Sequence, residues 1–91
     1  MQVRWTTKAW ADLDSISSRI AQDNPRAALD VGRTLYEGIM RLADFPNRGR
    51  VGRRLGTREL VFAPLPYIAV YRLKRDAVQI LRIWHGAQLR H

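Results

Sequence analysis

Residues 58–84 read RELVFAPLPYIAVYRLKRDAVQILRIW and contain three apolar segments rich in β-branched and aromatic residues. The segments cover 58–63, 67–73 and 77–84, and the connections at 64–66 and 74–76 contain proline or charged residues. Connections this short suit hairpins, so the sequence predicts three antiparallel strands. These strands decide the fold, because the chain before them must cover one face of the sheet that they form.

Two helices are predicted before the strands. The first covers 7–22, has Thr6 or Thr7 as its N-cap, and carries an apolar stripe at helical spacing: Ala9, Leu13, Ile16 and Ile20. The second has Asn24 as its N-cap and Pro25 in its first turn, runs to about residue 43, and carries a second stripe: Ala28, Val31, Leu35, Ile39 and Leu42. Three small residues should allow the two helices to approach closely: Ala27, Ala28 and Gly32.

The whole chain, residues 1–91, is expected to form one domain of the α+β class. Residues 3–5 alternate in polarity and predict an N-terminal edge strand, and the basic loop 48–54, RGRVGRR, has room for a very short strand. The predicted order is β-α-α-β-β-β. The N-terminal strand and a helical hairpin should pack on one face of a small antiparallel sheet.

Positive charge is concentrated in the second half of the chain, which has a formal net charge of +8 in total. Residues 1–47 contain six basic and six acidic side chains, whereas residues 48–91 contain ten basic and two acidic ones. Such a field attracts RNA, DNA or an acidic protein surface. A basic surface kept for solubility is the simpler alternative, but solubility does not require the charges to be segregated.

The composition argues against several kinds of site. There is no cysteine, and the two histidines, His85 and His91, are too few for a zinc site, so we expect no metal and no cofactor. No glycine-rich phosphate loop and no GxSxG motif is present. There is also no signal peptide and no apolar run long enough to span a bilayer, so we expect a cytoplasmic protein without membrane contact.

The second half of the chain provides the candidate binding residues, because the planar guanidinium of arginine suits phosphate and carboxylate groups. We expect a target-binding surface made of eight residues: Arg50, Arg53, Arg54, Arg58, Arg72, Arg82, Trp84 and His85. The alternatives are arginines that only extend into water at the margins of the sheet, and a histidine that only caps its end. We expect Arg58, Arg82 and His85 to matter more for function than for folding.

Strand alternation predicts on which face two of these arginines lie. Arg72 should share a face with Ile68 and Val70. Arg82 should share a face with three apolar residues of its own strand: Val78, Ile80 and Trp84. The sheet face away from the helices should therefore carry both apolar side chains and arginine.

Four stretches in this order resemble the ParE/RelE superfamily of toxins from type II toxin–antitoxin systems. They are ADLDSISSRIAQDNPRAA (11–28), RLADFPNRGRVGRRLGTREL (41–60), PYIAVYRL (66–73) and VQILRIWHGAQ (78–88), and they cover about 57 of 91 residues. The resemblance implies a toxin that is neutralised by a small cognate antitoxin, in a complex expected to be a heterotetramer or larger. It also implies that operator DNA is bound only through the antitoxin.

The two branches of the superfamily imply different targets. RelE-like members cut mRNA on the ribosome without a metal, and ParE-like members inhibit DNA gyrase without being enzymes. The arginine that RelE-like nucleases place on the scissile phosphate falls on Ile68, and residues 86–91 lack the tyrosine of those nucleases. The PYIAVYR and HGAQ patterns are typical of the ParE-like branch, so we favour a gyrase inhibitor. The alternatives are a ribonuclease that uses Arg58, Arg82 and His85, and a non-toxic basic nucleic-acid-binding module.

Overall fold

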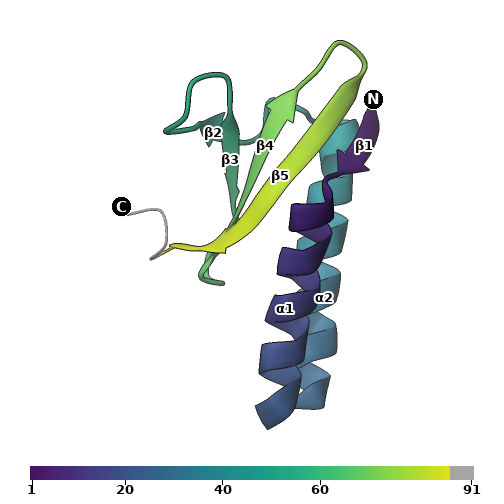
Figure 1. Ribbon diagram of the computed structural model, residues 1–91, viewed down its shortest axis with the longest axis vertical. Coiled ribbons are helices and arrows are strands. Elements are labelled where there is room, and N and C mark those ends of the chain that lie inside the picture. The colour runs from purple at the N-terminus through teal and green to yellow at the C-terminus, as the bar shows by residue number, and fades with distance from the viewer. Residues whose placement is uncertain (87–91) are drawn as a thin grey trace.

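The computed structural model describes residues 1–86 and confirms the predicted fold class. The elements are β1 (Gln2–Trp5), α1 (Thr7–Asp23), α2 (Pro25–Met40), the 3-10 turn η1 (Arg41–Ala43), β2 (Arg50–Val51), β3 (Arg58–Val61), β4 (Tyr67–Leu73) and β5 (Ala77–His85). Five strands form one sheet in the order β1-β5-β4-β3-β2. In Figure 1 the two helices run side by side as a hairpin and extend past the end of the sheet.

Local sequence sets the N-terminal ends of both helices as predicted. The Thr6 side chain accepts a hydrogen bond from the Ala9 backbone N–H at 3.1 Å, and the Asn24 side chain accepts one from the Ala27 N–H at 3.1 Å. These caps satisfy donors that the first turn of a helix leaves unpaired. The second helix ends at Met40, and the predicted extension to residue 43 takes the tighter form of the 3-10 turn η1.

Gly32 marks the close approach of the two helices, as predicted. A Cβ atom at this position would lie 3.2 Å from the Ser17 Oγ of α1. Because Gly32 has no side chain, α2 can pack closely against α1 at this position.

The prediction of antiparallel pairing is confirmed for β2 to β5, including the very short β2. β1 departs from it, because it lies beside β5 in parallel, from Gln2 opposite Ala77 to Trp5 opposite Ile80. The sheet is therefore mixed. Only strands joined by a tight turn must be antiparallel, and β1 and β5 are separated by the helical hairpin and three other strands.

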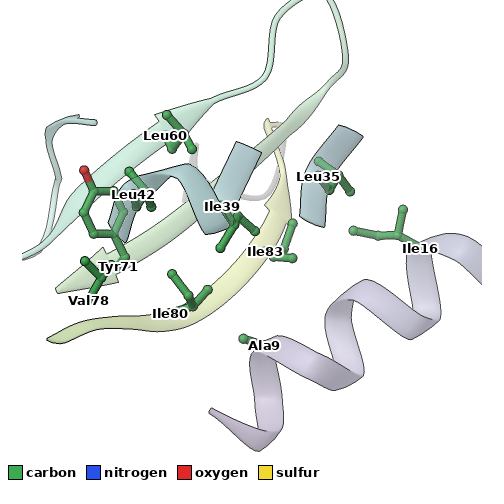
Figure 2. Packing of buried hydrophobic residues seen from close by; sticks show 11 residues of the cluster. Ala9, Ile16, Leu35, Ile39, Leu42, Leu60, Tyr71, Val78, Ile80 and Ile83 are labelled. Atoms are coloured by element: carbon green, nitrogen blue, oxygen red, sulfur yellow. The ribbon is translucent and has the colours of Figure 1, made fainter. Parts of the chain in front are cut away.

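The hydrophobic core lies between the helices and one face of the sheet. The fully buried large side chains come from both layers: Leu35, Ile39, Leu42, Tyr71, Val78 and Ile80. Figure 2 shows the helical members of this cluster packed against those of β4 and β5. Burying one such aliphatic side chain stabilises the fold by roughly 1.5–3 kcal/mol, so these contacts hold the layers together.

A β-bulge in β5 corrects one prediction about its faces. Val70 of β4 lies opposite Arg82, but its neighbour Tyr71 lies opposite Ile80, so Leu81 is an extra residue in β5. Consequently Ile80 and Ile83 both point into the core, although strict alternation would put them on opposite faces. Arg82 therefore does not share a face with Val78 and Ile80, because the alternation that predicted this is interrupted between them.

Tyr71 ties the core to the loop before β2. Its ring is completely buried, and its hydroxyl donates to the Pro46 carbonyl at 2.8 Å and accepts from the Gly49 N–H at 2.8 Å. A Cβ atom on Gly49 would lie 2.6 Å from this hydroxyl, so only glycine fits there. Burial raises the pKa of Tyr71, against the opposing effects of the Gly49 hydrogen bond and the charge of Arg58.

We predict that Tyr71→Phe lowers the free energy of unfolding at pH 7 by about 1–3 kcal/mol, because two buried backbone groups lose their partner. The raised pKa means that folding favours the neutral phenol, so wild-type protein loses this contribution as the pH rises above about 10. The difference between the two proteins should therefore shrink between pH 9 and 11 in urea unfolding. A difference that stays constant over this range would contradict the role assigned to the hydroxyl.

Candidate functional site

The sheet face opposite the core carries a depression of about 550 Å³. Its floor is apolar and consists of Val70 from β4 with Leu81 and Trp84 from β5. The bulge produces this floor, because it turns Leu81 and Arg82 toward the same side. Five cationic side chains line the depression around the floor: Lys8, Arg53, Arg54, Arg72 and Arg82. We call the site formed by these eight residues the basic depression.

Glu59 holds the loop that forms one wall of the basic depression. This carboxylate is only 4% exposed and accepts from the Arg50 Nε at 3.0 Å and from the Arg53 backbone N–H at 3.2 Å. Thr57 folds the same loop back, since its hydroxyl donates to the Arg54 carbonyl at 2.7 Å. The loop therefore presents the side chains of Arg53 and Arg54 to the depression, while the charge of Arg50 is balanced by Glu59.

Arg82 is engaged inside the protein. Its Nε and Nη2 donate to the two carboxylate oxygens of Asp12 on α1, at 2.8 and 3.0 Å. The same carboxylate accepts from the Ile83 backbone N–H at 2.9 Å, at the edge of β5 where pairing with β1 has ended. The hydrogen bonding that Arg82 donates to the Asp12 carboxylate raises the pKa of Arg82. The guanidinium carbon also lies 5.2 Å from the centre of the Trp84 ring, within cation–π range.

Arg58 and His85 lie outside the basic depression. Arg58 is opposite Tyr71 on the helix-facing side of the sheet, and its Nη1 donates to the Gly49 carbonyl at 2.8 Å and the Asn47 carbonyl at 3.3 Å. His85 is exposed at the end of β5, and its ring meets the Tyr67 ring edge-on with centroids 5.9 Å apart. Tyr67 and Tyr71 are four residues apart on β4, which separates Arg58 from His85 by about 13 Å along the strand.

Of the eight predicted binding residues, the structure gathers five at the basic depression: Arg53, Arg54, Arg72, Arg82 and Trp84. Arg50 is instead paired with Glu59, and Arg58 holds the segment before β2. Sequence reasoning missed Lys8, Val70 and Leu81 as lining residues, and it missed the positioning roles of Asp12 and Glu59. The signal for Glu59 was a single carboxylate within the apolar segment 58–63, whereas nothing in the sequence connects Asp12 to Arg82.

The basic depression combines charge with an apolar surface. Within residues 1–86, Arg82 is the only one of its five cations that makes an ion pair with a carboxylate, and Arg50 outside the depression makes another. The carboxylate of Glu59 already accepts hydrogen bonds at both oxygens. The site is thus suited to binding an anionic group beside an apolar one. In the same part of the chain no three His, Cys, Asp or Glu residues lie close enough to hold a metal, and no helix could cross a membrane.

Comparison with known proteins finds relatives of this chain among toxins. The family model described as the ParE toxin of the type II toxin–antitoxin system parDE matches residues 3–90. The Sinorhizobium fredii protein Y4kP is 44% identical over 87 residues, covering 96% of this chain and 90% of Y4kP. The toxin RelE2 of Caulobacter vibrioides is 41% identical over 88 residues, covering 97% and 98%.

A solved structure of a toxin–antitoxin system contains a chain with the same fold. The chromosomal ParDE toxin–antitoxin system from P. aeruginosa contains a chain that superposes with a TM-score of 0.86 at 34% identity, covering 93% of this chain and 95% of that one. The chain belongs to the ParE toxin family. It is therefore the toxin of a type II toxin–antitoxin system.

We predict that Asp12 and Arg82 are coupled in stability. Asp12→Ala should lower the free energy of unfolding by about 1–3 kcal/mol, because it also leaves the Ile83 N–H without its partner. Arg82→Ala should cost about 1 kcal/mol, since its side chain is 36% exposed and solvent screens the pair. Urea unfolding of both single variants and the double variant would give a coupling of about 0.5 kcal/mol or more. Strictly additive effects would show that the ion pair contributes nothing.

Proposed function

We propose that this toxin inhibits DNA gyrase by binding it, without catalysing a reaction. The observation that carries the proposal is the dispersal of the groups that a ribonuclease would need. Arg82 is paired with Asp12, Arg58 lies on the opposite face of the sheet, and His85 is at its far end. General acid–base cleavage requires such groups within hydrogen-bond reach of one phosphate. The position at which RelE-like nucleases have an arginine is occupied by Ile68, which is 8% exposed.

A RelE-like ribonuclease is the second candidate. It is favoured by the name of the Caulobacter relative, toxin RelE2, which is 41% identical to this chain. The basic depression could also receive a phosphate backbone, which is how a plain nucleic-acid-binding module would use it. Membership of a toxin family speaks against a harmless module. Within residues 1–86, no preformed acid–base pair lies at the depression, which speaks against the ribonuclease.

A cognate antitoxin completes the proposed system. The match to the parDE family and to a ParDE structure supports such a partner. We propose that the two proteins meet in the cytoplasm, where gyrase acts, and assemble as a heterotetramer or larger complex. Operator DNA would be bound through the antitoxin, since residues 1–86 contain one helical hairpin that packs on the sheet and no helix-turn-helix arrangement.

The target can be decided with two purified systems. Toxin added to gyrase and relaxed plasmid should block supercoiling, whereas ribosome-bound mRNA treated with the same toxin should stay intact. The antitoxin should restore supercoiling when it is added in equimolar amount. Arg72→Glu should weaken inhibition at least tenfold if the basic depression contacts gyrase, and Arg75→Glu, in the turn between β4 and β5, should not. Cleaved mRNA together with uninhibited gyrase would replace this proposal with the RelE-like one.

A gel-shift experiment can test whether operator DNA is bound only through the antitoxin. The toxin–antitoxin complex should retard a DNA fragment that carries its own promoter, and the toxin alone should not do so with any preference for that fragment. The comparison needs a fragment of equal length and unrelated sequence, because a protein of charge +8 binds DNA without specificity at low salt. Promoter-specific retardation by the toxin alone would contradict the proposal.

A further inference from the structure

We propose that the loop between β2 and β3 inserts Leu55 into an apolar recess of the target protein that is rimmed by carboxylates. We call residues 52–57 the β2–β3 loop. Leu55 is the anchor of the contact, and the guanidinium groups of Arg53 and Arg54 bind the rim. This inference rests on the proposed function in requiring a protein target, and it adds a contact outside the floor of the basic depression.

The first argument is that the most exposed apolar side chains lie at this loop. Among the large hydrophobic residues of the described chain, Leu55 is 100% exposed and Val51, just before the loop, is 81% exposed, and no other exceeds 67%. β2 is the edge of the sheet opposite β1, and in Figure 1 the loop projects from that edge. A single exposed leucine is common on protein surfaces, but two such side chains within five residues indicate a contact surface.

The second argument is that buried polar side chains are used to build the loop. Thr57 and Glu59 are each 4% exposed and are the only buried polar side chains in the described part of the chain. The Thr57 hydroxyl donates to the Arg54 carbonyl at 2.7 Å, and the Thr57 carbonyl accepts from the Gly52 N–H at 2.8 Å. Glu59 accepts from the Arg53 N–H at 3.2 Å. Burying polar groups is costly unless they are hydrogen-bonded, and here both shape a loop whose residues 53–56 are all exposed.

Two glycines fix the conformation of the loop. Gly56 follows Leu55 and has a φ of +78°, in the left-handed region that favours glycine. A Cβ atom on Gly52 would lie 2.4 Å from the Thr57 Oγ1, so the close approach at the base of the loop also requires glycine. The loop is therefore ordered before a partner arrives, and Leu55 loses little backbone entropy when it binds.

The charge beside Leu55 selects an acidic partner. Arg53 and Arg54 are exposed, and within residues 1–86 neither has a carboxylate in ion-pair range. Arginine binds a carboxylate through two parallel hydrogen bonds, so acidic side chains around a recess would hold both groups. A second copy of this chain brings the same arginines and a formal net charge of +8, and would be repelled.

The shape of the loop favours the target over the antitoxin. A projecting side chain needs a concave partner, and pockets that bury an apolar group are formed where several elements of a folded protein meet. A peptide segment that lies along a groove or a strand edge supplies side chains, and it has no recess to receive one. We therefore assign Leu55 to the target, and the affinity for the antitoxin should not depend on it.

The test compares Leu55→Asp with Leu29→Asp, the same change at a position of α2 that is 67% exposed. Leu55→Asp should raise the toxin concentration that half-inhibits gyrase supercoiling at least tenfold, because a charge replaces the apolar group that must be buried. Leu55→Met keeps the apolar character and should stay within about threefold of wild type. Leu29→Asp should inhibit as wild type does. Thermal unfolding checks that each variant keeps its fold, since both positions are exposed.

Two further measurements separate the occupants of this contact. Isothermal titration of purified antitoxin should give Leu55→Asp a Kd within about twofold of wild type. Induction in bacteria at matched expression should show growth arrest by wild type and by Leu29→Asp, and much weaker arrest by Leu55→Asp. If wild type arrests growth without inhibiting gyrase, the proposed function fails, and growth arrest by Leu55→Asp decides whether the loop binds the target.

Three results would overturn the inference. Leu55→Asp that arrests growth as fully as wild type would show that the loop does not bind the target. Loss of antitoxin binding in Leu55→Asp with growth arrest retained would assign the loop to the antitoxin. A wild-type dimer in analytical ultracentrifugation that becomes a monomer in Leu55→Asp would assign it to a second copy of this chain.

Discussion

The extra residue Leu81 in β5 allows the sheet to have a core face and a binding face. The packing of the first and the basic depression of the second both depend on it. Val78 and Ile80 before the bulge pack in the core under the helices, and Ile83 after the bulge packs there too. Without the extra residue, a regular strand would turn Ile83 to solvent and Arg82 into the core. The bulge therefore allows one strand of nine residues to complete the core and still to contribute Leu81, Arg82 and Trp84 to the opposite face.

The arginines near this face are of two kinds. Arg82 and Arg50 are paired with Asp12 and Glu59, and each carboxylate also accepts a backbone N–H. These pairs fix the edge of β5 and the loop after β2, so they serve the shape of the site. The remaining cations have no such partner within the described residues. The position of each arginine in the fold therefore decides its role. The ion-paired arginines hold the surface in shape, and the others are available to bind a ligand.

Much of the fold could be predicted because it is encoded locally. The caps Thr6 and Asn24 act on N–H groups three residues away, and the hairpins follow from connections of three or five residues. Arg72 was placed correctly with Val70, because β4 is regular. The face of Arg82 was predicted wrongly, because a bulge has no signature in an apolar strand. Its partner Asp12 is 70 residues away, and no local pattern connects the two. Arg58 was also taken for a surface residue, although it holds the loop at Gly49.

The unpaired cations also affect the stability of the free toxin. A chain of 91 residues buries only about 60–65% of the surface that its unfolded form exposes, so its margin of stability is small. Concentrated charge reduces that margin further through self-repulsion. A partner that binds only the folded toxin adds about 2.7 kcal/mol when its concentration is 100 times Kd. A surface that costs stability in isolation is thus compatible with a protein that spends its time in a complex. The concentrated charge thus lowers the stability of the toxin when it is free.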